Sequence, residues 1–143
     1  MIHAFDPRAV FLARHAQHVV LIHFPIALFL IGVLFDLVSR LKRDDRLGTA
    51  AQVNLTAAAI CIVPAYLTGL LAWHFALDGQ RLHGVLLYHL GLASATMALV
   101  ITAWWLRSRT QSRPLISLAV ELAGVLSISL TAHLGGFLTG VNS

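Results

Sequence analysis

Four long apolar stretches dominate the 143-residue chain, and each is long enough to cross a lipid bilayer as a helix. They cover approximately residues 19–38, 50–75, 85–106 and 115–138. Only 11% of the residues are charged, whereas a soluble domain carries about a quarter. Short polar connections separate the stretches, and such connections join antiparallel neighbours. The sequence therefore predicts an all-α integral membrane protein in which residues 1–143 form a single domain, an antiparallel up-and-down bundle of four transmembrane helices.

The segment before the first stretch has the features of a short helix at the membrane interface. Asp6 is a suitable helix N-cap, and Pro7 fits the first helical position. Phe11 and Leu12 provide an apolar side, and Arg8 and Arg14 provide a charged one. We therefore expect a short N-terminal interfacial helix ahead of the first membrane span.

The basic residues are distributed unevenly between the two sides of this topology. Three lie with the termini and the second connection: Arg8, Arg14 and Arg81. Seven lie in the first and third connections: Arg40, Lys42, Arg43, Arg46, Arg107, Arg109 and Arg113. Cytoplasmic loops carry the excess of Lys and Arg, so both termini are predicted to be periplasmic. The net charge of +4 is thus explained by topology, and no nucleic-acid partner is expected.

The eight histidines all fall on the predicted outer side of the bundle. Four of them are expected at the level of the lipid headgroups: His3, His15, His74 and His83. His23, His89 and His133 lie about one turn inside three different helices, at a depth of about 6–9 Å. Ionisable residues within spans usually face the bundle interior and mark functional sites. The sequence therefore predicts a layer of imidazoles in the outer part of the membrane.

Two facing imidazoles can hold haem b between helices, because neutral histidines ligate iron from both sides. We predict His23 and His89 as the axial ligands of the haem iron. His18 and His133 are predicted to bind the cofactor as substitutes or as supporting residues. A stripe of small residues on the second helix, which includes Gly69, either allows close helix packing or leaves room for a flat cofactor.

Other uses of the histidines stay open. Copper or zinc could be bound by His18, His23 and His89, because imidazole suits both metals. The protein could instead be a non-redox structural or assembly subunit of a membrane complex, with its histidines only hydrogen-bonded. A metal-handling or transport protein could use the histidines and Glu121 as a polar path. The sequence contains no nucleophile elbow, phosphate-binding loop or CxxCH haem-attachment motif, so a stand-alone enzyme is not expected.

Three further residues within the spans carry expectations. Pro25 removes one backbone hydrogen bond, and the freed carbonyl of Leu21 could accept an imidazole N–H. Asp36 is expected to pair with Arg40, one helical turn further on. Glu121 has no such neighbour in its own helix and could face Asp36 or bind a proton. No internal repeat is visible in the sequence.

Several stretches together resemble a bacterial membrane family catalogued as domain of unknown function 2231. They are HVVLIHFPIALFLIGVLFDL, YLTGLLAW, YHL and LGGFLTGV, and the resemblance extends from His18 to Val141. On this resemblance the residues at family-pattern positions are His18, His23, Asp36, Thr68, Gly69, His89, Gly135 and Gly136. The chain departs from the family at Val19, where proline is common, and its terminal glycine-rich segment is shorter.

Some members of that family carry attached Rieske-type or c-type cytochrome domains. The resemblance therefore implies electron transfer through a membrane-bound haem, in agreement with the histidine layer. We expect a multi-pass protein of the bacterial inner membrane, with the haem near the periplasmic face. Its expected partners are lipid and other membrane or periplasmic redox subunits of a larger respiratory or photosynthetic complex. Self-association into a homo-oligomer is a further expectation.

Overall fold

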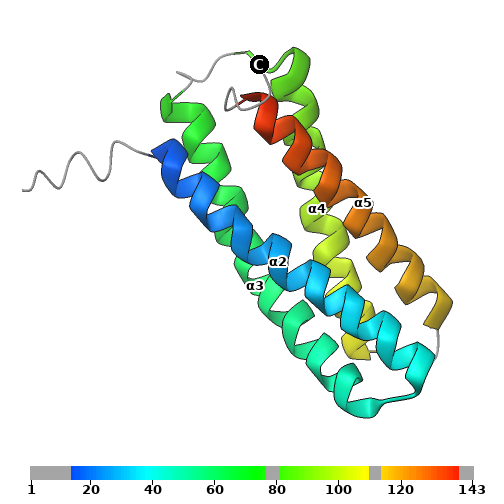
Figure 1. The fold of residues 1–143 in the computed structure, drawn as a ribbon. Helices are drawn as coiled ribbons and strands as arrows, with labels where there is room; N and C mark the ends of the chain where they lie inside the picture. Colours follow the sequence, from blue (N-terminus) through cyan, green and yellow to red (C-terminus); the bar gives the residue numbers. More distant parts are fainter. Residues whose placement is uncertain (1–13, 77–80, 110–113, 139–143) are drawn as a thin grey trace, which may run out of the picture.

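The computed structural model describes residues 14–76, 81–109 and 114–138, and these residues form helices and their connections (Figure 1). The helices are α2 (Arg14–Lys42), α3 (Asp45–Ala76), α4 (Gly84–Arg109) and α5 (Pro114–Leu138). All four are long and apolar enough to cross a membrane, so the four predicted spans are confirmed. Most helix ends lie one to five residues outside the predicted ones. The expected interfacial helix falls among residues 1–13, outside the described residues.

Local interactions explain where the helices turn and begin. Between α2 and α3, Arg43 adopts a φ of 54°, a left-handed conformation that ends α2. Asp44 then caps α3, because its Oδ1 accepts a hydrogen bond of 2.9 Å from the backbone N–H of Arg46. The Ser39 hydroxyl also donates to the Asp44 carbonyl at 2.9 Å and holds the turn together. At the start of α5, Pro114 occupies a position where a missing N–H costs nothing.

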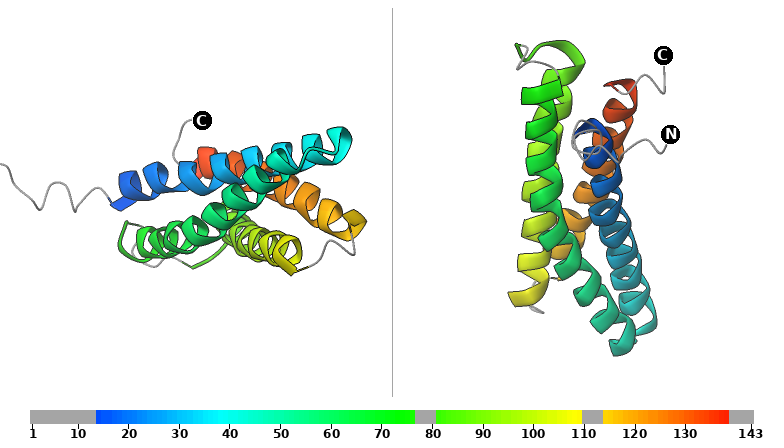
Figure 2. Two further views of the ribbon diagram at one scale, coloured as in Figure 1. Left: turned by 90° about the horizontal axis from the view of Figure 1, so that it is seen from below. Right: turned by 90° about the vertical axis from the view of Figure 1, so that its left-hand side faces the viewer.

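The helices form two hairpins that run side by side (Figures 1 and 2). The first hairpin is α2 packed along α3, and the second is α4 packed along α5. Between hairpins, α3 packs on α4, and α2 meets α5 less extensively. We call the end where α2 and α4 begin the histidine end, and the opposite end the arginine end. The arrangement confirms the predicted all-α bundle.

The surface of the bundle is apolar, as a lipid-facing surface must be. Leu41 and Leu115, for example, are 76% and 79% exposed. Inside, Phe29, Leu55 and Val100 are fully buried and form the centre of the hydrophobic core. This core lies midway along the bundle and separates the histidine end from the arginine end.

A group of polar side chains, three of them buried, lies on the arginine-end side of the core. Asp36 is fully buried and forms ion pairs with Arg40, as predicted, and with Arg107 of α4. Glu121 of α5 is also fully buried and faces Asp36, in agreement with expectation. The Ser117 hydroxyl donates to Glu121 Oε1 at 3.0 Å. We call these five residues the carboxyl cluster.

Candidate functional site

A pocket of about 520 Å³ lies between the two hairpins at the histidine end. This volume is within the range of about 300–1,000 Å³ found for small-molecule and cofactor sites. All four helices contribute to its wall, and most of the lining side chains are apolar, among them Ile22, Ile26, Ile62, Leu86 and Leu90. The pocket is therefore a mostly apolar space in which the few polar side chains are the ones that can bind a ligand specifically.

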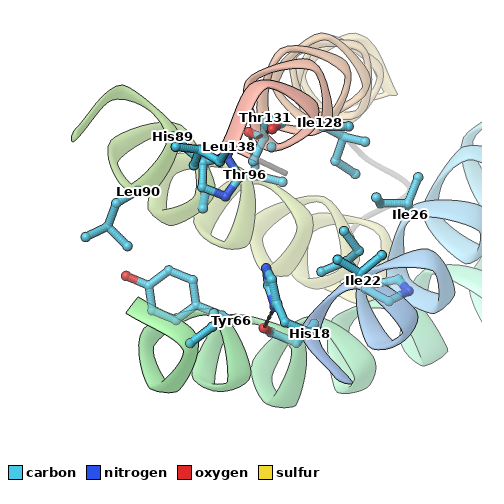
Figure 3. A pocket seen from close by; sticks show the side chains of 18 of the residues that line it. His18, Ile22, Ile26, Tyr66, His89, Leu90, Thr96, Ile128, Thr131 and Leu138 are labelled. Carbon is cyan, nitrogen blue, oxygen red and sulfur yellow. Dashed lines mark hydrogen bonds between the residues drawn. The ribbon is translucent and has the colours of Figure 1, made fainter. Parts of the chain in front are cut away.

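His18 is one of these polar side chains and enters the pocket from the first hairpin (Figure 3). Its Nδ1 lies 3.1 Å from the Ala65 carbonyl oxygen and 3.2 Å from Thr68 Oγ1. The Thr68 hydroxyl itself donates to the Ala65 carbonyl at 2.8 Å. Because a carbonyl oxygen can only accept, Nδ1 of His18 carries the ring proton. The lone pair of the ring is then on Nε2, the atom that a neutral histidine uses to bind a metal.

His89 enters the same pocket from the second hairpin, on the side opposite His18 (Figure 3). Its Nδ1 donates to the Thr131 carbonyl on α5 at 3.1 Å. The same reasoning places the ring proton on Nδ1 and the lone pair on Nε2. Each of the two rings is thus anchored by a backbone carbonyl of the neighbouring helix in its own hairpin. Anchors of this kind fix the orientation of metal-binding histidines.

Two glycines make room for the two rings. A Cβ at Gly69 would lie 2.9 Å from Cε1 of His18. A Cβ at Gly135 would lie 3.2 Å from Cε1 of His89. Each glycine follows the anchoring carbonyl by four residues, so ring, carbonyl and glycine form the same small unit in both hairpins. A Cβ at Gly69 would therefore force a shift of the His18 ring, and a Cβ at Gly135 would require a smaller shift of the His89 ring.

The similarity between the two hairpins extends beyond this small unit to their buried positions. Buried positions of α2 recur in α4 at the interval of 71 residues that separates His18 from His89: Pro25 and Thr96, Phe29 and Val100, Gly32 and Ala103. Buried positions of α3 recur in α5 at the interval of 66 residues that separates Gly69 from Gly135: Ala51 and Ser117, Leu55 and Glu121, Ala58 and Gly124, Ile62 and Ile128. The two hairpins therefore share a pattern of buried positions, and the pocket lies between faces that correspond in this pattern.

The other predicted cofactor residues have different environments. His23 is exposed at the rim of the pocket, and its Nδ1 donates to the Val19 carbonyl of its own helix at 2.6 Å. That acceptor lies two residues before Leu21, whose carbonyl was the expected acceptor. His133 is exposed, and its ring packs edge-to-face on Phe137 with centroids 5.0 Å apart. The structure therefore brings together His18 and His89, whereas His23 borders the same pocket and His133 lies on the surface.

The remaining histidines are outside this arrangement. His74 is exposed and packs edge-to-face on Phe75, and His83 is exposed. His3 and the side chain of His15 lie outside the described residues. Among the residues that the structure describes, no three His, Cys, Asp or Glu side chains are arranged to hold a metal ion.

Hydroxyl groups form the floor of the pocket next to the His89 anchor. Thr96 Oγ1 lies 2.7 Å from Ser127 Oγ and 3.0 Å from Thr131 Oγ1. The Thr131 hydroxyl donates to the Ser127 carbonyl at 2.7 Å. The two contacts of Thr96 join α4 to α5 at Thr131, the residue whose carbonyl anchors His89. Sequence reasoning missed Thr131 as an anchor, because a backbone carbonyl leaves no signature in the residue type.

Comparison with known proteins identifies the family of the chain. No curated protein and no solved structure matches the chain. The family model described as predicted membrane protein (DUF2231) matches residues 14–141, which include all four helices and the whole described pocket. This match confirms the resemblance seen in the sequence. The chain belongs to the DUF2231 family of membrane proteins.

Proposed function

We propose that this protein binds haem b in the histidine-end pocket and transfers electrons, with His18 and His89 as the axial ligands. The proposal keeps His89 from the sequence prediction and takes His18 in place of His23. One observation carries it: two imidazoles line one pocket from opposite hairpins, each with Nδ1–H anchored on a backbone carbonyl. A bound haem would supply one-electron redox chemistry at this position.

The surroundings of the two rings fit a flat, largely apolar group. The lining is mostly aliphatic, which excludes water and thereby influences the reduction potential of a bound iron centre. Gly69 and Gly135 keep both rings close to the helices behind them and so leave the space between the rings open. The likeness of the two hairpins supports the proposal too, because His18 and His89 would offer the group the same kind of anchored imidazole from both sides of the pocket.

The distribution of charge supports an orientation. The described basic residues of the first and third connections lie at the arginine end, so the histidine end faces the periplasm of a bacterial inner membrane. In this orientation the electron partners are membrane or periplasmic redox subunits. A cysteine placed at Arg81 should react with an impermeant reagent added outside the inner membrane, and one placed at Lys42 should not. The reverse pattern would contradict the orientation.

The absorption spectrum of the purified protein tests the haem proposal. Expression with adequate haem should give a Soret band and the spectrum of bis-histidine ligation. Alanine at His18 or His89 should abolish that ligation, whereas His133→Ala should leave it intact as a matched loss of an exposed imidazole. His23→Ala distinguishes this proposal from the ligand pair predicted from the sequence, because the variant should also keep the bis-histidine spectrum if His18 is the ligand. A missing Soret band, or a spectrum unchanged in the His18 and His89 double variant, would refute the proposal.

A further inference from the structure

The carboxyl cluster contains two acidic side chains, Asp36 and Glu121, which differ in their interaction partners. Both oxygens of Asp36 are engaged by guanidinium groups, one by Arg40 of α2 and the other by Arg107 of α4. Glu121, which faces Asp36, has the Ser117 hydroxyl as the donor to Oε1. Its Oε2 is buried and makes no hydrogen bond within the part of the chain that the structure describes.

The internal repeat shows that the fold does not need an acid at Glu121. The equivalent residue of the first hairpin is Leu55, which is also fully buried and belongs to the hydrophobic core. Asp36 and Arg107 likewise occupy equivalent positions of the repeat, but these two residues form an ion pair with each other. The position of Glu121 is therefore one that the first hairpin occupies with a buried leucine side chain. The carboxyl group of Glu121, in contrast, has one oxygen that can still form a hydrogen bond.

We infer that Glu121 is a proton-binding site, in which one proton on Oε2 bridges Glu121 to Asp36 and exchanges with water at the arginine end. A buried second carboxylate beside Asp36 would be repelled by it and poorly solvated, and a proton on Oε2 removes both costs. The bound proton supplies the donor that Oε2 lacks. Binding adds the proton to a carboxylate oxygen and release returns it to water, with no redox change.

The surroundings explain why the proton can also leave. Arg40 from α2 and Arg107 from α4 carry two positive charges, and Asp36 carries one negative charge. An ionised Glu121 would therefore make the carboxyl cluster electrically neutral. From α3, the Gly48 carbonyl accepts a hydrogen bond of 3.2 Å from Arg107 and holds that side chain at the cluster. Both protonation states of Glu121 are therefore accommodated, which is what a site of exchange requires.

Access to water is on one side. The Arg40 and Arg107 side chains keep 24% and 21% of their exposure, so they connect the buried carboxyls to the arginine end. On the other side, the fully buried Phe29 ring lies against Gly124, one turn from Glu121, where a Cβ would come within 2.7 Å of the ring. This contact separates the proton site from the histidine-end pocket. The site is thus distinct from the proposed haem site.

The test uses the fact that Glu121 is the only glutamate in the chain. Cell-free synthesis with glutamate carrying ¹³C in its side-chain carboxyl labels this one group in the full-length protein. The protein is placed in lipid vesicles, and infrared spectra are recorded over a range of pH. We expect a ¹³C-shifted carboxylic-acid band that shifts again in D₂O and is replaced by carboxylate bands as the pH rises. Carboxylate bands alone, or an acid band that never responds to pH, would overturn the inference.

Variants provide a second, independent reading. Glu121→Leu copies the residue that the first hairpin uses at the equivalent position, and Glu121→Gln keeps the shape. In unlabelled protein, both should lose the pH-sensitive acid band, whereas Asp45→Asn, which removes an exposed acid at the same end, should keep it. Persistence of the band in either Glu121 variant would refute the assignment. Because the readout needs no haem, its outcome is separate from that of the haem proposal.

Discussion

Replacing Gly69 by alanine tests whether the His18 ring must stay at its anchor for haem to bind. The new Cβ would lie 2.9 Å from His18 Cε1, whereas ordinary van der Waals contact begins at 3.4 Å, so the ring must retreat by the difference of about 0.5 Å. Because α3 supplies both this Cβ and the Ala65 carbonyl, a shift of the ring relative to α3 disturbs its hydrogen bond to that carbonyl. Overpacking of this kind costs about 1–3 kcal/mol, which corresponds to a rise of about 5- to 150-fold in the haem dissociation constant.

The assay is a haem titration of the apoprotein, followed by absorption. Gly91→Ala is the matched control, because a Cβ at Gly91 meets nothing within 4 Å although the residue is two positions from His89. Gly135→Ala should have an intermediate effect, since its Cβ would lie 3.2 Å from the His89 ring. Alanine favours a helix over glycine, so lost folding would not explain weaker binding. Wild-type affinity in Gly69→Ala, or an equal loss in Gly91→Ala, would refute the reasoning.

Three further predictions concern the pocket, the core and the carboxyl cluster. Thr68→Val removes one acceptor of the His18 Nδ1–H but leaves the Ala65 carbonyl, so haem affinity should fall by only about 2- to 10-fold in the same titration, consistent with about 0.5–1.5 kcal/mol per hydrogen bond. Phe29→Ala empties the centre of the core and should lower the free energy of unfolding by about 3–5 kcal/mol in denaturant titrations in detergent, and a loss below 1 kcal/mol would contradict the central role of this ring. Asp36→Asn leaves two arginines without their carboxylate and should destabilise the protein by about 3–5 kcal/mol, whereas Asp45→Asn should stay within about 0.5 kcal/mol; equal effects would show that the buried ion pairs are not important for stability.

The spans and one ion pair could be predicted from the sequence, but the choice between His18 and His23 could not. Five residues along a helix correspond to a rotation of about 140° between the two side chains, so only one of them can face the bundle centre. In a soluble helix the polar face would decide which one. Here α2 is apolar on its lipid-facing side as well, and the orientation is set by α3, which supplies the Ala65 carbonyl and the space at Gly69.

The repeat was invisible in the sequence for a related reason. It preserves burial rather than residue type, so Phe29 is matched by Val100 and Pro25 by Thr96. Membrane helices drawn from a small set of apolar residues match one another by chance, which hides a true correspondence. His18 and His89 are the matched pair with distinctive chemistry, and a single pair does not reveal a register.

The ion pair between Asp36 and Arg107 has a consequence for how the two halves of the chain recognise each other. These residues occupy equivalent positions, so a first hairpin paired with its own copy would bring two Asp36 side chains together. Two second hairpins would likewise oppose two Arg107 side chains. Like charges in such contacts cost several kcal/mol, whereas the unlike pair is attractive. The opposite charges thus favour association of the first hairpin with the second over association of either hairpin with its own copy. The two hairpins, produced as separate polypeptides, should therefore assemble as a heterodimer.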